Sequence, residues 1–571
     1  MPASSSSLVV LGCSATKFDS AGSIPAVHLY DGPMYRVLRS RFRSHRWPER
    51  LNISVLSAKY GLIGSVAPIK HYDQRMTVDR ARELAPGVNS ALLKLSQSNS
   101  RVHLILGKDY LKSVNLDVLS AHTRIELAEG PIGEKLHAFS TLLNLQARQK
   151  RIQRTLPRLE RLLYFLPDWD DFLDAEFDFE NDQFSTPRRA NRNELHMIKL
   201  LQPTRICDGV LVSLAQHLGT KGLLRHVPLT DPHLLRPKSV KEHFGLGDDQ
   251  WAFGDCGAFS YANEDEPAIS VEQAVAVYEL YEFDLGASVD HIPLKEIFVN
   301  GKKKALSLKE RENRVKLTRR NAEAFISLWA ERNCSFTPVG VIQGIEAEDY
   351  GQQIRDYMAM GYTHIALGGL VPRSDDEIAA VVASVAKALR FTKDRPWIHL
   401  LGVFRPKIQT KFREGGVNSF DSATYFRKAW LRSDQNYLGV DGKWYGAIRV
   451  PPTHDARTLE RLKESGKRKS TIERNERRAL DALRGFSKGT ISEDDCLDAV
   501  LRYDKLLNRG DLSGKYLRAQ YRTTLHNQPW KKCKCAVCRD IGIDVVIFRG
   551  YNRNKRRGAH NTCRLYEQLA K

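Results

Sequence analysis

The chain has 571 residues, of which 42% are hydrophobic and 27% charged, a composition typical of soluble globular proteins. It contains no apolar run long enough to cross a bilayer, and no basic region precedes its first short apolar stretch, which argues against a membrane span and a signal peptide. These two features predict a cytoplasmic protein, and the length predicts two to four domains at roughly 150 residues each.

Positive charge is the strongest bulk signal. Lys and Arg number 88 against 67 Asp and Glu, a formal net charge of +21, and residues 451–571 alone hold 28 basic and 15 acidic residues. This excess favours a polyanionic partner, and the lack of an apolar amphipathic anchor favours nucleic acid over a membrane. A surface charged for solubility is the alternative.

The first 150 residues alternate the apolar runs LVVLG, ISVLSA and VHLILG with helix-favouring stretches, which predicts a small α/β domain at 1–150. Polar residues follow these runs, where a parallel sheet usually binds ligands. They are Cys13, Ser14 and Lys17, then Ser57, Lys59 and Tyr60, then Gly107 and Lys108. A charged connector, LQARQKRIQRTLPRLERL, is predicted to lead as a helix into the next domain.

Residues 160–450 contain eight strand-like apolar runs: LLYFLPDWDD, ICDGVLVS, WAFGDCGAFSY, FDLGASVDHI, PVGVIQG, HIALGGL, IHLLGVF and NSFDSA. Helical patterns such as RRNAEAFISLWAERN and DDEIAAVVASVAKALR lie between some of them. The alternation predicts an α/β fold with a (β/α)₈ TIM barrel. A doubly wound open sheet is the competing architecture, but it would not need so many parallel strands.

Polar residues and glycines fall at the carboxyl ends of these runs. They are Asp255, Asp290, Gln343, Gly368, Gly369 and Asp421. One aspartate at such a position is more often a turn or cap residue. Together they predict a site at the rim where barrel enzymes place their chemistry.

The last 121 residues divide into two predicted parts. Residues 451–530 are polar and helix-favouring, which predicts a basic helical insertion that either binds phosphates or is simply solvated. In residues 531–571, the motif CKCAVC and a later histidine supply Cys533, Cys535, Cys538 and His560. Three thiolates and an imidazole suit a tetrahedral Zn²⁺, and four protein ligands leave no open position, which predicts a structural ion. Cys563 is the alternative ligand.

The motif CxCxxC with a downstream histidine, after GDCGAFSY, GVIQG, ALGGL and SFDSA, resembles the tRNA-guanine transglycosylase superfamily, whose barrel carries a zinc subdomain near its end. The stretches LLYFLPDWDD, FDLGASVDHI, SFDSATYFRKAW and IFRGYNRNKRRGAHN are most similar to its DNA-modifying DpdA branch. The resemblance covers about 160–571. The first domain is distantly similar to the YaaA family through the stretches CSATK, PAVHLYDGP, LSAKYGL and HYDQRM. Its ligand is left open between nucleic acid, a base and a partner protein.

The resemblance implies a role for each rim residue. Asp421 stands where the family has its nucleophile, and a carboxylate can attack an anomeric carbon for the reason retaining glycosidases use one. Asp255 matches the second essential aspartate, which exchanges protons with the departing and arriving bases. The implied base-binding residues are Asp290, Gln343, Gly368, Gly369 and Leu370. Glycines let the backbone approach a flat ligand, and a buried polar pocket discriminates strongly between bases.

The implied nucleic-acid contacts are basic residues outside the pocket. They are Arg427, Lys428 and Arg432, and a predicted basic loop with Arg553, Lys555, Arg556 and Arg557. An enzyme acting on duplex DNA must flip its target nucleotide, and backbone contacts offset that cost.

The resulting hypothesis is an enzyme that exchanges guanine in DNA for 7-cyano-7-deazaguanine without an energy-carrying cofactor. Its implied partners are DNA, the free 7-deazaguanine base and accessory DNA-modification proteins. A tRNA-guanine transglycosylase is the alternative within the same chemistry, and a catalytically dead nucleic-acid-binding scaffold is the alternative of another class. The presence of both Asp255 and Asp421 argues against the scaffold, because carboxylates repel a phosphodiester backbone.

Overall fold

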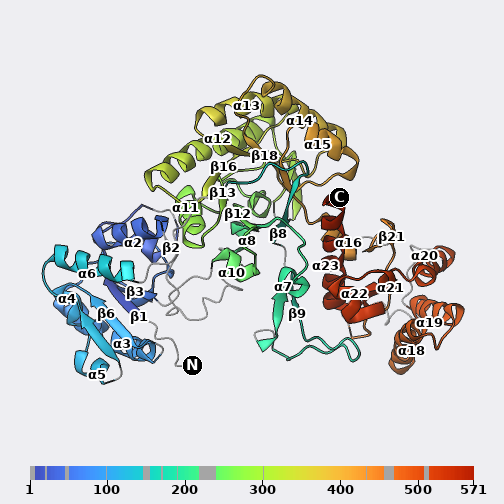
Figure 1. Ribbon diagram of the computed structural model, residues 1–571, viewed down its shortest axis with the longest axis horizontal. Coiled ribbons are helices and arrows are strands. Elements are labelled where there is room, and N and C mark those ends of the chain that lie inside the picture. Colours follow the sequence, from blue (N-terminus) through green and yellow to red (C-terminus); the bar gives the residue numbers. More distant parts are fainter. Residues whose placement is uncertain are drawn as a thin grey trace. The chain divides into compact units, whose positions relative to one another are not determined.

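A computed structural model (Figure 1) describes residues 7–570 except 20–21, 45–50, 98, 122, 146–154, 169–170, 189–190, 218–238, 300, 432–433, 455–467 and 507–513. The chain divides into two compact units. Unit 1 is Met1–Leu159, Leu211–His243 and Trp251–Ser419, and unit 2 is Glu160–Val210, Phe244–Gln250 and Phe420–Lys571. No helix in the described part of the chain is long and apolar enough to cross a membrane.

The N-terminal part of unit 1 is a five-stranded sheet of order β4-β3-β1-β6-β7. Its strands are β1 (Ser7–Gly12), β3 (Leu51–Ser57), β4 (Gly61–Gly64), β6 (Arg101–Ile105) and β7 (Arg124–Leu127). The three predicted apolar runs are the parallel strands β1, β3 and β6, in which Val9 pairs with Ile53 on one side and His103 on the other. Only β4 is antiparallel to its neighbour.

Helices cover both faces of this sheet (Figure 1). They are α2 (Pro33–Ser44), α3 (Val78–Ser96), α4 (Lys108–Leu111), α5 (Leu116–Ser120) and α6 (Ile132–Leu145). The side chain of Thr77 accepts a hydrogen bond from the Arg80 amide and so caps α3, as N-cap threonines do. Leu92 of α3 packs with Val10 and Leu104 in the buried core. The short elements α1 (Ala26–Leu29), β2 (Ile24–Pro25) and β5 (Pro68–Ile69) lie beside the sheet.

The predicted barrel is confirmed: eight strands close in the order β11-β12-β13-β16-β17-β18-β19-β8. They are β8 (Leu163–Pro167), β11 (Gly209–Ser213), β12 (Trp251–Asp255), β13 (Leu285–Ala287), β16 (Thr337–Ile342), β17 (His364–Leu367), β18 (Trp397–Leu400) and β19 (Ser419–Asp421). Each of the eight apolar runs supplies one strand, and spatial order follows chain order, as right-handed crossovers require.

Helices alternate with the barrel strands. They are α8 (Leu214–His217), α10 (Val240–Phe244), α11 (Val271–Leu280), α12 (Leu308–Glu331), α13 (Ala347–Ala359), α14 (Asp375–Ala388), α15 (Gln409–Glu414) and α16 (Thr424–Leu431), with the 3₁₀ turns η2 (Ala258–Tyr261) and η3 (Pro406–Ile408). Capping boxes begin α11, α12 and α14 at Ser270, Ser307 and Ser374, which satisfies amide groups that have no partner inside the helix. The hairpin of β14 (Glu296–Val299) and β15 (Lys302–Ala305) precedes α12.

The predicted helical connector is only partly testable. Residues 146–154 lie outside the described residues, and residues 155–162 form no helix. Pro157 explains the second part, because the residue before a proline is driven out of the helical region and proline lacks an amide hydrogen.

The C-terminal part of unit 2 is mostly helical. It contains α18 (Lys469–Lys488), α19 (Glu493–Leu506), α20 (Gly514–Asn527), α21 (Pro529–Lys532), α22 (Ala536–Ile541), η4 (Gly542–Val546) and α23 (Gly550–Leu569). Short elements complete the unit: β9 (Phe172–Asp174), β10 (Glu194–His196), α7 (Met197–Leu201), β20 (Tyr437–Leu438), β21 (Trp444–Tyr445), β22 (Ile448–Arg449) and β23 (Ile547–Phe548). Gly558 of α23 lies against Phe426 of α16, where a Cβ would come within 2.5 Å of the ring, so the two helices pack closely.

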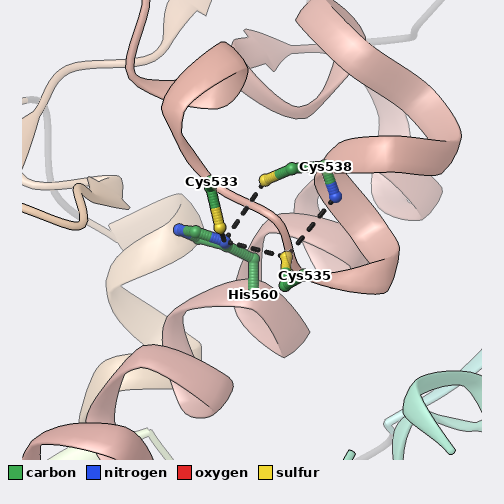
Figure 2. A group of neighbouring side chains, drawn as sticks. All are labelled: Cys533, Cys535, Cys538 and His560. Carbon is green, nitrogen blue, oxygen red and sulfur yellow. Dashed lines mark hydrogen bonds between the residues drawn. The ribbon is translucent and has the colours of Figure 1, made fainter.

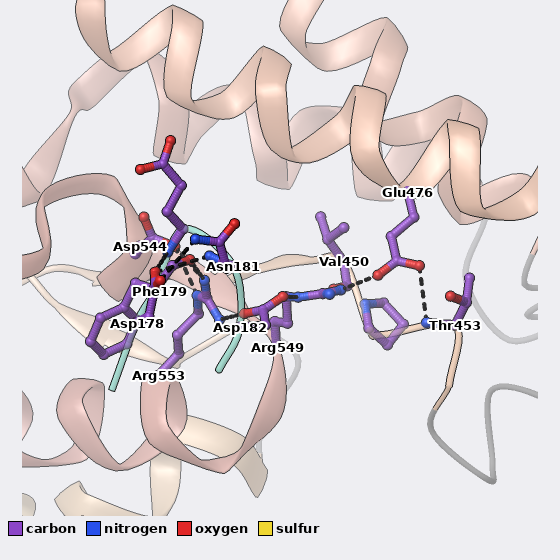
Figure 3. Close-up of polar contacts among 12 residues, drawn as sticks. Asp178, Phe179, Asn181, Asp182, Val450, Thr453, Glu476, Asp544, Arg549 and Arg553 are labelled. Atoms are coloured by element: carbon purple, nitrogen blue, oxygen red, sulfur yellow. Dashed lines mark hydrogen bonds and ion pairs between the residues drawn. The ribbon is translucent and has the colours of Figure 1, made fainter. Parts of the chain in front are cut away.

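A buried ion network joins distant segments of unit 2 (Figure 3). Arg549 pairs with Glu476 at 2.7 Å and with Asp182, and Arg553 pairs with Asp182 and, at 2.8 Å, with Asp544. The network therefore links the segment before β10, helix α18 and the first turns of α23. Both guanidinium groups are buried, so the ion pairs are needed to offset the free-energy cost of removing these charges from water.

Candidate active site and metal centre

The polar rim residues lie where the sequence predicted, at the carboxyl ends of barrel strands. Asp255 and Asp421 are the last residues of β12 and β19. Gln343 and Gly368 directly follow β16 and β17, and Asp290 lies three residues beyond β13. Strand geometry thus places each of them at the end of the barrel that carries catalysis in this fold.

Asp290 and Gln343 form a buried pair. The Gln343 Nε2 donates a hydrogen bond of 2.7 Å to Asp290 Oδ2, and the two residues are 2% and 1% exposed. Asp290 Oδ1 and Gln343 Oε1 have no hydrogen-bond partner among the described residues. Two buried acceptors without donors are costly unless a ligand supplies them, so the pair fits a ligand that presents N–H groups.

The Gly368–Gly369 turn lies directly against this pair. A Cβ on Gly368 would come within 2.2 Å of Gln343 Nε2, and one on Gly369 within 2.6 Å of Gln343 Oε1. Gly369 also has a φ of +70°, a left-handed conformation that favours glycine. Leu370 follows and is fully buried. The structure therefore brings five predicted pocket residues together: Asp290, Gln343, Gly368, Gly369 and Leu370.

Two tyrosines that the sequence analysis missed hold this pocket in place. The Tyr350 hydroxyl donates to the Gly368 carbonyl at 2.8 Å, and the Tyr261 hydroxyl donates to the Asp290 carbonyl at 2.9 Å. Arg373 donates to the carbonyls of Gly344 and Ile345, at 2.9 Å each. Buried tyrosines are ordinary core residues, so nothing in the sequence marked these two.

Asp255, at the end of β12, lies on a tight turn. Its Oδ2 accepts a hydrogen bond of 2.9 Å from the Gly257 amide, and Gly257 has a φ of +78°. The neighbouring Cys256 is fully buried and its Sγ lies 3.6 Å from the Ala287 carbonyl. Burial, with the nearby Asp255 carboxylate, raises the pKa of Cys256 well above its usual value. The thiol is therefore protonated at neutral pH, as a packing residue would be.

Asp421 is 5% exposed, and Tyr164 of β8 holds the residues on either side of it. The Tyr164 ring lies 5.3 Å from that of Phe420, and its hydroxyl donates to the Ser422 carbonyl at 3.0 Å. The backbone that carries the carboxylate is thus fixed on both sides.

A fourth carboxylate, Asp171, follows β8 and was not singled out from the sequence. It is 1% exposed, its Oδ2 lies 3.6 Å from His196 Nε2, and burial raises its pKa to about 6 although His196 acts in the opposite direction. His196 Nδ1 accepts from the Ile198 amide at 3.2 Å, so Nε2 carries the proton and faces Asp171.

The four predicted metal ligands converge in unit 2 (Figure 2). His560 Nδ1 lies 3.6, 3.4 and 3.3 Å from the Sγ atoms of Cys533, Cys535 and Cys538. A tetrahedral zinc ion would separate its sulfur and nitrogen ligands by about 3.5 Å, given the usual bond lengths. All four residues are buried, and their ligand atoms lie within 4.8 Å of one another, so the group can hold a metal ion with no open position.

The surroundings orient these ligands. His560 Nε2 donates to the Leu438 carbonyl at 2.8 Å, which leaves Nδ1 free of a proton and able to bind metal. The Tyr437 ring stacks on His560 at 4.0 Å. Cys563, the alternative ligand, lies outside the group, and its Sγ instead contacts Glu567 Oε1 at 3.5 Å.

The predicted basic loop is wrong. Arg553, Lys555, Arg556 and Arg557 lie in helix α23 and are 1%, 9%, 2% and 0% exposed. Protein oxygens accept hydrogen bonds from them: Arg557 donates to the Ala429, Val545 and Ile547 carbonyls, Lys555 to Phe172 O, and Arg556 to Asp540. Arg556 Nε has no partner among the described residues, but it is buried, so the charges of these four residues serve contacts inside the protein.

The other predicted nucleic-acid contacts lie in or near α16. Arg427 is half-buried there, and Lys428 donates to Gln435 at 3.0 Å with its ammonium group 4.2 Å from the Trp444 ring centroid. Arg432 lies outside the described residues.

Comparisons with known proteins agree with this architecture. The chain is 35% identical over 414 residues to the DNA-guanine transglycosylase of Salmonella montevideo, an alignment that covers 72% of this chain and 97% of that protein. It is 25% identical over 219 residues to the tRNA-guanine(15) transglycosylase of Methanococcus aeolicus, covering 37% of this chain and 31% of that protein. Residues 8–141 match a family of unknown function, DUF6884. The chain therefore belongs to the DNA-guanine transglycosylase family, whose members are glycosyltransferases that act on nucleic acid.

Proposed function

We propose that the protein exchanges guanine in DNA for 7-cyano-7-deazaguanine by double displacement. The observation that carries this proposal is the buried group of Asp290, Gln343 and the Gly368–Gly369 turn, with two acceptors that lack donors among the described residues. Guanine and 7-deazaguanines present an N–H and an amino group on one edge, which such acceptors bind. The glycine turn lets the Gln343 side chain lie directly against the backbone, which holds its amide beside Asp290.

In the first step, a carboxylate oxygen of Asp421 attacks C1′ of the target nucleoside. The bond from C1′ to N9 of guanine breaks, and Asp255 delivers the proton that the departing base takes up. A covalent glycosyl ester remains on Asp421, as in retaining glycosidases.

In the second step, the incoming base occupies the pocket and loses its N9 proton to Asp255. The ring nitrogen attacks C1′ from the face that guanine left, and the ester bond to Asp421 breaks. Two inversions retain the original configuration, and each proton given up in one step returns in the other. No external energy source is needed, because one glycosidic bond replaces another.

This mechanism requires Asp255 and Asp421 to approach the same sugar. Both residues end strands of one closed barrel, and the carboxyl ends of barrel strands share one rim. That shared rim supports the assignment of the two roles.

DNA is the proposed substrate because the relative that covers most of the chain is named for DNA. The tRNA-named relative matches a shorter part of the chain at lower identity. We also propose Zn²⁺ as the ion of the Cys533–Cys535–Cys538–His560 group, where it would hold the chain together and supply no step of the reaction.

An exchange assay tests the substrate. Radiolabelled guanine and unlabelled 7-cyano-7-deazaguanine are offered with duplex DNA, single-stranded DNA and tRNA in parallel. We expect the offered bases to be incorporated into DNA. Incorporation of these bases into tRNA alone would replace DNA by tRNA as the substrate.

The Asp421→Asn variant tests the nucleophile. Covalent protein–DNA adducts, trapped by denaturation and resolved by gel electrophoresis, should form with the wild type and disappear in this variant. Asp376→Asn, in the exposed first turn of α14, is the control that should form the adduct normally. Undiminished exchange by Asp421→Asn would refute the assigned role.

A further inference from the structure

The carboxyl edge of the N-terminal sheet carries two lysines that contact one aromatic ring. The Nζ of Lys17 lies 4.5 Å and that of Lys59 5.7 Å from the centroid of the Tyr72 ring. Tyr72 is 5% exposed, and its hydroxyl is hydrogen-bonded to the hydroxyls of Ser57 and Tyr30, at 2.8 Å each. The ring is therefore held firmly while the two ammonium groups gather at it.

Neither lysine has an acidic partner among the described residues. The hydrogen bond of Lys17 is to the Ala15 carbonyl at 3.5 Å. The nearby Asp31 pairs with Arg36 and Arg39 instead. Two cations beside one ring without a counter-charge raise the local positive potential, which favours an anion.

The position of these lysines is where parallel sheets bind ligands. Lys17 follows β1 and Lys59 follows β3, and these strands are neighbours in the sheet. Arg80 of α3 donates to the carbonyls of Ala58 and Lys59, at 2.8 and 3.0 Å. The turn that carries Lys59 is thus fixed before any ligand arrives.

An exposed aromatic ring lies beside the lysines. Tyr60 is 38% exposed, its ring meets that of Tyr72 edge-on at 5.4 Å, and the Lys59 Nζ lies 5.5 Å from its centroid. Lysines that hold a phosphate next to an aromatic ring that stacks a base are the usual means of binding single-stranded nucleic acid. A duplex offers no free base face to such a ring.

We propose that Lys17, Lys59, Tyr60 and Tyr72, the lysine–tyrosine cluster, bind an unpaired stretch of DNA. The two ammonium groups contact backbone phosphates, and Tyr60 stacks on a neighbouring base. The proposal gives the N-terminal domain a nucleic-acid site of its own and is independent of base exchange in the barrel.

Binding of a fluorescent 20-nucleotide single-stranded DNA to the full chain, measured by anisotropy at several salt concentrations, tests the proposal. The double variant Lys17→Gln/Lys59→Gln should bind roughly tenfold more weakly at 0.15 M salt, and its slope of log K against log salt should be shallower by about 1.4. Tyr60→Ala should also lose roughly tenfold, but with an unchanged salt slope, because stacking releases no counterions.

Lys94→Gln is the matched control. Lys94 is an exposed lysine in the last turn of α3, and Arg80 places the first turn of that helix at the cluster. Lys94 therefore lies at the opposite end of the helix and should leave binding unchanged. A double variant with the affinity and salt slope of Lys94→Gln would overturn the proposal.

Asp421→Asn separates this site from the reaction. The variant should lose exchange yet bind the single strand normally, so failure of the proposed reaction and failure of the cluster give different results. The variants of Lys17, Lys59, Tyr60 and Lys94 should retain the wild-type melting temperature, because the substituted side chains are exposed or lie at the sheet edge.

Discussion

Burial shifts the pKa of Asp290, the residue that we propose binds the base. Burial raises the pKa of its carboxyl group to about 6, although the hydrogen bond from Gln343 acts in the opposite direction. Because this pKa lies above the ordinary aspartate value, the folded protein holds the proton more tightly than the unfolded chain does. The stability contribution of Asp290 is therefore present at low pH and is lost as the pH rises through about 6.

The charged carboxylate is the better acceptor for the N–H groups of a base, so binding should have the opposite pH dependence. The affinity for 7-cyano-7-deazaguanine, measured by calorimetry, should fall about tenfold from pH 7 to pH 5 as Asp290 takes up its proton. Asp290→Asn should bind weakly at both pH values and lose this dependence. An equal pH dependence in the variant would show that another group titrates.

At the scale of single elements, helix α23 carries an internal role that its composition conceals. Arg553 is 1% exposed and lies between Asp182 and Asp544, which are remote from each other in the sequence. The helix therefore connects two segments that each contribute a carboxylate to pair with its arginine (Figure 3).

Removal of one buried charge should be costly. Arg553→Ala removes one of the two cations that pair with Asp182 and with Asp544, whose other partners are Arg549 and Arg484. The loss of this buried charge should lower the free energy of unfolding by about 3–5 kcal/mol in urea denaturation. The control, Arg518→Ala in α20, removes ion pairs with Asp498 and Asp494 in which all three side chains are exposed, and should cost only about 0–1 kcal/mol. Similar losses in both variants would show that the buried network adds no special stability.

At the scale of the whole molecule, the metal group ties together parts of unit 2 that are distant in sequence. It joins the Cys533–Cys538 segment to α23 through His560, and His560 in turn contacts Tyr437 and Leu438. A metal bound only by the folded chain stabilises it by mass action.

Cys535→Ser should therefore lose the metal, whereas wild-type protein should contain about one zinc ion per chain by mass spectrometry. The melting temperature of the Cys535→Ser variant should fall by roughly 10 °C, as a loss of about 3 kcal/mol in the free energy of unfolding would cause in a unit of this size. Cys563→Ser, at a buried cysteine outside the group, should keep the metal. Loss of the metal in both variants would implicate Cys563 as a ligand.

Local sequence patterns were sufficient to predict the barrel and the positions of its rim residues. Each apolar run became one strand, and Asp255 and Asp421 each end a strand as predicted, because an apolar run bounded by polar residues specifies where a buried strand stops. The ligand motif was also readable, since CKCAVC concentrates three thiolates within six residues.

Whether a charged side chain is exposed, and which residue it pairs with, depended on contacts between residues that are distant in the sequence. The basic run in α23 reads as a surface feature, yet Arg553 meets Asp182 and Arg557 donates to Ala429, because a charge pattern does not reveal which partners folding will bring. The same holds for the hydrogen bond between Asp290 and Gln343. Residue types and spacing set the fold and the candidate chemistry, whereas long-range packing decided which charges face a ligand and which serve the interior.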